Sequence, residues 1–193
     1  MLDHIFTDAI AALRESLEHV LLERQAVEEH LTVDILLGDV AWETSYGLPG
    51  EHNPARVQAD LRLGWPTWSQ TGYRSWTLGE DPAEPPAIVL TVVFRMQELL
   101  VAPDPQAVLL SLTSESPMVG EFTLLRTGPT VETVFDDDLS AQHHAIEISY
   151  EGVYELGDKS LTEGTVLDKD FGALGGWISA SLVSLGDINF EYR

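Results

Sequence analysis

Apolar residues change their spacing near His30, and this change constrains the fold more than any other feature of the chain. Up to that point they recur at three- and four-residue steps, which places them on one stripe of a helix. Beyond it, short segments alternate apolar and polar side chains, as half-buried strands do. The sequence therefore predicts a long amphipathic helix over about residues 2–30 and a β-rich body over about residues 31–193. The helical stripe consists of Leu2, Phe6, Ile10, Leu13, Leu17, Val20, Leu21 and Val27.

Strand-like segments fill the β-rich body, and turns rich in Gly and Pro separate them. The segment 56–63 is the clearest strand, because its apolar side chains alternate with polar and charged ones. The near-continuous apolar run 88–96 indicates a central strand that is buried on both faces. Since no helical pattern lies between these segments, we expect an antiparallel sheet, sandwich or barrel. Further strands are predicted at 32–37, 40–46, 73–78, 108–112, 120–126, 145–156, 177–185 and, after the turn at Gly186-Asp187, 188–192.

The whole chain is expected to form one domain. It contains no internal repeat and no low-complexity segment, and none of its loops is long enough to require an interdomain linker. Of its 193 residues, 44% are hydrophobic, which is enough to bury a sizeable core. The prediction is a single α+β domain over residues 1–193, with a long N-terminal amphipathic helix followed by a mostly antiparallel β-sheet, sandwich or barrel.

The chain carries a net charge of −22, from 32 Asp and Glu against 10 Lys and Arg. Such a surface repels phosphate backbones and anionic headgroups, so we expect no direct binding of nucleic acid or membranes. Disorder does not explain the acidity, because disordered acidic chains are poor in apolar residues. Two interpretations stay open: the acids keep the protein soluble, either in high salt or as an ordinary acidic surface, or they face a basic partner.

Cysteine is absent, which excludes disulfides, thiolate catalysis and zinc–thiolate sites. The first residues, Met1 to His4, carry no basic region and no unbroken apolar stretch follows, so we expect no secretory signal. The longest apolar run, near 87–94, is too short to span a bilayer. The sequence thus predicts a cytoplasmic protein or a part of a soluble particle.

An aromatic segment over 64–76 is the best candidate for a ligand- or partner-binding site. Trp65, Trp68, Tyr73 and Trp76 lie there among small polar residues. Exposed aromatic rings with hydrogen-bonding neighbours stack on sugars or on the apolar surface of a partner. The alternative is that these rings fill the core or form cross-strand pairs in a hairpin.

Candidate metal ligands cluster at Asp136-Asp137-Asp138 and His143-His144. Carboxylate oxygens and imidazole nitrogens bind Mg²⁺, Mn²⁺ or Zn²⁺. Adjacent side chains of a strand point to opposite faces, however, so the two histidines would not share one ion if a strand begins there. Three consecutive Asp are also typical of a solvated turn. Asp136, Asp138 and His143 are kept as candidates, and no cofactor is expected.

Other motif-like segments lack the context that gives them a function. Asp170-Phe171-Gly172 matches a kinase tripeptide, but the glycine loop, strand lysine and catalytic loop are missing. The oxygens of 158–163 resemble a calcium loop whose glycine is misplaced by one position. The run Gly172–Gly176 matches no phosphate-binding motif and is expected to be a tight segment before a strand. With no nucleophile signature either, we expect no enzyme.

Three classes of function are compatible with these observations. The first, which we favour, is a non-catalytic structural or assembly subunit of a larger homo-oligomeric complex, such as a virion component. The second is an acidic inhibitor that imitates nucleic-acid phosphates and occupies a basic partner. The third is a carbohydrate- or small-ligand-binding β module that uses the aromatic segment. Protein partners, including further copies of the chain, are therefore expected.

Overall fold

The protein is built from one antiparallel sheet and a set of helices, as the predicted α+β class requires. The computed structural model describes residues 3–20, 26–33, 37–48, 55–135 and 142–193. The seven-stranded sheet has the order β1-β2-β3-β4-β7-β5, and β6 pairs with β7 beside β5. The strands are β1 (Ala26–Val33), β2 (Val40–Gly47), β3 (Val57–Trp65), β4 (Ala87–Leu99), β5 (Leu125–Arg126), β6 (Thr130–Phe135) and β7 (Gln142–Glu155). The helices are α1 (His4–Val20), α2 (Thr67–Thr77), α3 (Pro105–Leu110), α4 (Asp158–Thr162) and α5 (Gly164–Gly186).

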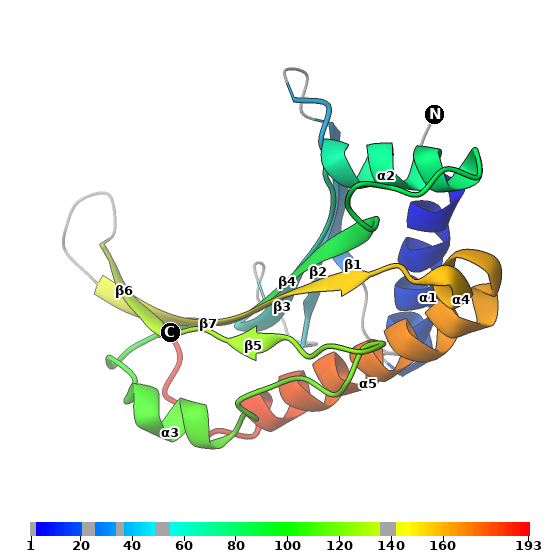
Figure 1. The fold of residues 1–193 in the computed structure, drawn as a ribbon. Helices are drawn as coiled ribbons and strands as arrows, with labels where there is room; N and C mark the ends of the chain where they lie inside the picture. Colours follow the sequence, from blue (N-terminus) through cyan, green and yellow to red (C-terminus); the bar gives the residue numbers. More distant parts are fainter. Residues whose placement is uncertain (1–2, 21–25, 34–36, 49–54, 136–141) are drawn as a thin grey trace.

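Helices α1 and α5 pack against each other and lie on one face of the sheet (Figure 1). Because successive side chains of a strand point to opposite faces, every second side chain of the long strands points to this face. These side chains are buried beneath the helices and form the core. Helix α5 completes the core with apolar residues at three- and four-residue steps, all buried. They are Leu167, Phe171, Leu174, Ile178, Leu182 and Leu185.

Glycine allows α1 and α5 to approach closely. A Cβ atom added at Gly175 would lie 2.5 Å from Ser16 Oγ and 2.9 Å from Ser16 Cβ. The Ser16 hydroxyl also donates a hydrogen bond to the Gly172 carbonyl at 3.0 Å. The run 172–176 therefore lies inside α5 and meets α1, whereas the sequence analysis placed it in a tight segment before a strand. That prediction was wrong because the run is helical, and Gly175 within it serves the contact with α1.

Three of the predicted strands are helical, and in two cases capping explains the difference. The predicted strand 73–78 falls in α2, whose N-terminus is capped from a distance: Asp39 Oδ1 accepts from Thr67 N at 2.6 Å. The predicted strand 108–112 overlaps α3, where the Asp104 side chain accepts from Gln106 N at 3.0 Å and Pro105 opens the helix. The third, 177–185, is the end of α5, because the helical period that begins at Leu167 continues through it.

The N-terminal helix is shorter than predicted. Helix α1 ends at Val20, and by Ala26 the chain is in β1, so Val27 belongs to a strand and not to the helical stripe. This strand pairs antiparallel with β2, and Val33 lies opposite Val40 in the register. At the other end, the predicted strand 188–192 makes only an isolated bridge, from Tyr192 to Leu99.

The predicted strands that match the structure are those with a clean pattern. The segments 40–46, 56–63 and 145–156 correspond to β2, β3 and β7, and 88–96 corresponds to β4, which is central as expected. Of the segment predicted at 120–126, only Leu125–Arg126 is paired as β5. Burial of β4 on both faces was wrong, because Val89 is 36% exposed on the face away from the helices.

Candidate functional site

The sheet face opposite α1 and α5 carries no helix among the described residues (Figure 1). We call it the open face. Its side chains come from alternate positions of the paired strands, so the register aligns them in rows across the sheet. One row runs Ser45, Asp60, Val93 and Ser149, each opposite the next. The open face consists of Glu43, Ser45, Gln58, Asp60, Arg62, Thr91, Val93, Arg95, Gln97, Glu132, Glu147, Ser149, Glu151 and Val153.

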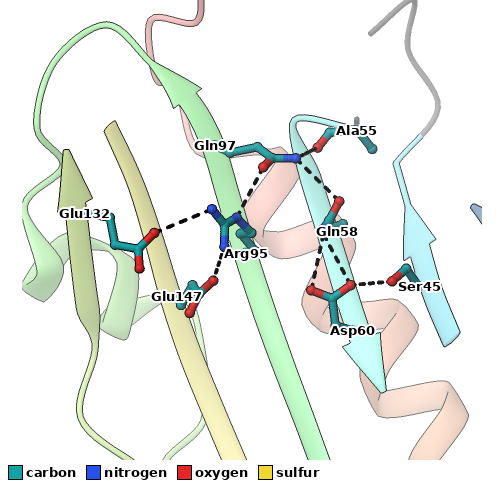
Figure 2. Close-up of polar contacts among 8 residues, drawn as sticks. All are labelled: Ser45, Ala55, Gln58, Asp60, Arg95, Gln97, Glu132 and Glu147. Carbon is teal, nitrogen blue, oxygen red and sulfur yellow. Dashed lines mark hydrogen bonds and ion pairs between the residues drawn. The ribbon is translucent and has the colours of Figure 1, made fainter. Parts of the chain in front are cut away.

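Arg95 of β4 lies between two carboxylates on the open face (Figure 2). Its Nη1 pairs with Glu147 of β7, the residue directly opposite in the register, and its Nη2 lies 3.5 Å from Glu132 Oε2 of β6. The three side chains are partly shielded, at 26%, 27% and 45% exposed. Coulomb attraction between partly buried charges is screened less than at a free surface, so this triad fixes the arginine.

A chain of hydrogen bonds continues from Arg95 toward β2 (Figure 2). Arg95 Nε donates to Gln97 Oε1 at 3.2 Å, and Gln97 Nε2 donates to the Ala55 carbonyl at 2.7 Å and to Gln58 Oε1 at 3.4 Å. Gln58 Nε2 donates to Asp60 at 3.2 Å, and Ser45 Oγ donates to the same carboxylate at 2.5 Å. The polar side chains of five strands are thereby ordered in one network.

A shallow pocket of about 340 Å³ adjoins this network. Its lining includes Asp60, Ser45 and the ion pair of Arg62 with Glu43, whose Nη1 and Oε1 atoms lie 3.1 Å apart. The lining is completed by Thr44, Leu61, Thr91 and Val93. The pocket therefore offers carboxylate and hydroxyl oxygens beside a lining that is largely apolar and includes Leu61 and Val93.

The open face is net negative. Both of its arginines, Arg62 and Arg95, are engaged by carboxylates. Asp60, in contrast, accepts hydrogen bonds from the neutral side chains Ser45 and Gln58, and no Arg or Lys in the described part of the chain forms an ion pair with it. Glu151, on β7 opposite Thr91, is exposed on the same face. Ordered acceptors with uncancelled negative charge can bind ammonium or guanidinium groups.

The structure separates the aromatic residues that the sequence singled out. Trp65 and Tyr73 are 1% and 3% exposed. Trp65 stacks on Phe6 and donates from Nε1 to Asp3 at 2.9 Å, while Tyr73 stacks on Trp76 with ring centroids 6.2 Å apart. Trp68, on α2, is 41% exposed. Trp65, Tyr73 and Trp76 thus join α1, β3 and α2, and they do not form an open platform.

Of the predicted metal ligands, His143 lies in the described part of the chain, whereas Asp136 and Asp138 fall outside it. His143 sits in β7 with Nε2 3.5 Å from Glu98 Oε1. Its neighbour His144 is 8% exposed, with Nδ1 3.1 Å from Thr133 Oγ1, so the two imidazoles point to opposite faces as the strand period requires. Among the described residues, no cluster of three His, Asp or Glu has the spacing of a metal site.

Sequence reasoning missed the residues of the open-face network. The alternation in 56–63 contained a signal for Gln58, Asp60 and Arg62, because polar residues there share one face. Arg95 lies inside the near-continuous apolar run 88–96, where the surrounding apolar residues predict burial and hide a polar face. Its partners Glu147 and Glu132 are 52 and 37 positions away in the sequence, and only strand pairing brings the three together.

Comparison with known proteins identifies no relative. No family model matches the sequence, no curated protein is significantly similar to it, and no solved structure matches the fold. Among the described helices, none is long and apolar enough to cross a membrane.

Proposed function

We propose that this chain is a non-catalytic assembly protein that binds a basic protein partner on its open face. The observation that carries the proposal is the sheet face left uncovered by the described helices, on which an ordered polar network holds the Asp60 carboxylate with no described cation paired to it, and Glu151 is exposed on the same face. A face this polar is stable in water and need not be covered by the chain's own apolar residues. Its carboxylate and hydroxyl oxygens can accept hydrogen bonds from donors of a partner protein. The acidic residues elsewhere on the chain add a long-range field of the same sign.

The chemistry of the open face favours a lysine- or arginine-rich segment. Guanidinium and ammonium groups donate several hydrogen bonds and are attracted by the field, whereas phosphate groups are repelled. Ser45 and Gln58 already orient the Asp60 carboxylate, so little side-chain entropy is lost when a donor arrives. The neighbouring pocket, about 340 Å³, has room for one long side chain.

The test must separate the open face from the overall charge, because any acidic protein attracts basic peptides weakly. We would titrate the whole chain with a fluorescent arginine-rich peptide in low salt. The open-face variant combines Asp60→Asn and Glu151→Gln. The matched control combines Asp168→Asn and Glu15→Gln, which remove the same charge from exposed positions on α5 and α1.

We expect the open-face variant to weaken peptide binding by roughly three- to tenfold, and the control by less than about twofold. A carboxylate that touches the peptide contributes more to binding than a distant carboxylate, whose field is screened by salt. Circular dichroism of each variant checks that the fold is kept. Equal losses in the two variants would show that the peptide responds only to net charge, and the proposal would then fail.

A further inference from the structure

Strand β6 leaves one long side unpaired at the edge of the sheet. It pairs with β7 over its whole length, from Thr130 opposite Glu147 to Phe135 opposite Gln142, and no other described strand pairs with it. All six of its residues are exposed. Figure 1 shows β6 and the start of β7 extending beyond the helices. No described residue therefore occupies its outer N–H and C=O groups, which can pair with a further strand.

The sequence of β6 does little to prevent such pairing. Natural edge strands are protected by lysine, proline, bulges or a covering element. Thr-Val-Glu-Thr-Val-Phe contains no lysine or proline, and its β-branched and aromatic residues favour extended structure. Val131, Val134 and Phe135 are 40%, 37% and 54% exposed, which is more apolar surface than a solvated edge needs.

We propose that β6 pairs antiparallel with β6 of a second copy, with Thr133 on the two-fold axis. In an antiparallel pair related by an axis normal to the sheet, residues opposite each other lie on the same face. Centring on Thr133 places Val131 opposite Phe135 of the second copy on one face, and Glu132 opposite Val134 on the other. Centring on Glu132 instead would place the two Glu132 side chains directly opposite each other, and their like charges would repel.

The charged residue nearest the proposed two-fold axis does not oppose this register. Glu132 is the one charged residue of β6, and within each copy it is already 3.5 Å from Arg95. The remaining contacts are Val131 with Phe135 and Thr133 with Thr133. The opposing force is the repulsion between two bodies that each carry −22, and added salt screens it. The occupant is thus another copy of this chain, and pairing joins the two open faces into one surface.

Single cysteines test the register directly, because the chain has no cysteine of its own. In the proposed dimer, Thr133→Cys puts two thiols across the axis, and Cα atoms about 4.5–5.5 Å apart in such a pair fit a disulfide. The matched control is Thr130→Cys, the same substitution on the same exposed strand, whose two copies lie about 20 Å apart by strand rise. We expect mild oxidation to cross-link the first variant, and to leave the second without an intermolecular disulfide on a non-reducing gel.

A charge-swap pair tests the same contact without cross-linking. Val131→Lys with Phe135→Lys places like charges opposite each other across the axis, so dimer formation should be lost by sedimentation or light scattering. Val131→Lys with Phe135→Glu places opposite charges there, and the dimer should return. Within one copy these positions are about 13 Å apart, so an effect on the monomer cannot mimic the rescue.

Two results would overturn the proposal. One is equal cross-linking of the two single-cysteine variants, which would mean random collision. The other is a monomeric mass for the unmodified chain at high protein concentration in about 1 M salt, where charge repulsion is screened to a few ångströms. Neither result bears on peptide binding at the open face, so the two proposals fail separately.

Discussion

Arg95 and Arg62 lie on the same face of the sheet, on the neighbouring strands β4 and β3, but their surroundings differ. We therefore expect them to contribute differently to the stability of the fold. Arg95 is 26% exposed between Glu132 and Glu147, whereas Arg62 is 61% exposed beside Glu43. Replacing Arg95 removes contacts with two carboxylates, one of them the 27% exposed Glu147, whereas replacing Arg62 removes one contact made by an arginine that is already well solvated. The two arginines thus allow the same substitution to be compared in two environments.

Replacing Arg95 with Met should therefore destabilise the fold more than replacing Arg62 with Met. We expect a loss of about 1–2 kcal/mol in the free energy of unfolding for Arg95→Met, after allowance for solvent screening, and less than about 0.5 kcal/mol for Arg62→Met. Urea denaturation of the two variants measures both values. If the losses were equal, the network around Arg95 would be an ordinary set of surface contacts.

At the scale of elements, α5 shows why a period can be misread in a short window. Within 177–185, apolar residues at 178, 182 and 185 fit a helix, while the serines between them also mimic the alternation of a strand. Extension back to Leu167 settles the period as helical. By contrast, β3 alternates cleanly over its whole length and was predicted within two residues of its ends.

Some elements depend on contacts that no local pattern contains. Helix α2 begins where Asp39, 28 residues earlier, accepts a hydrogen bond from Thr67. The open-face network likewise joins residues of five strands, so its members could be predicted as exposed but not as partners. The sequence was sufficient for the α+β class and for the clean strands. It was insufficient for the site, because that site exists only through strand order.

Contact between α1 and α5 gives a prediction at the same scale, with two neighbouring glycines as its test. At Gly175 an added Cβ would meet Ser16 Oγ and Cβ at 2.5 and 2.9 Å, whereas at Gly176 no atom lies within 4 Å. Gly175→Ala should cost about 1–3 kcal/mol by overpacking, and Gly176→Ala should gain up to about 1 kcal/mol from helix propensity. Thermal unfolding of both variants measures the difference. A gain in both would mean that the helices can separate without cost.

For the whole molecule, the net charge of −22 affects folding, dimer formation and peptide binding together. Added salt changes these three in different directions, so their responses to salt distinguish them. Raising the salt from about 0.05 M to about 0.5 M shortens the screening length from roughly 14 Å to roughly 4 Å. Self-repulsion within the fold and between two copies falls, so the free energy of unfolding and the dimer fraction should both rise. Attraction of a basic peptide to the open face also falls, so its affinity should drop.

One salt series on the unmodified protein therefore measures three responses with defined signs. Urea denaturation gives stability, sedimentation gives the dimer fraction, and peptide fluorescence gives affinity. Sucrose at equal osmolality is the control, because it does not screen charge. A dimer that dissociates as salt rises would be held by ion pairs and not by β6, since the proposed contact pairs Glu132 with Val134 and contains no intermolecular ion pair. A peptide whose affinity is insensitive to salt would bind through apolar contacts, and the carboxylates of the open face would not be its receptor.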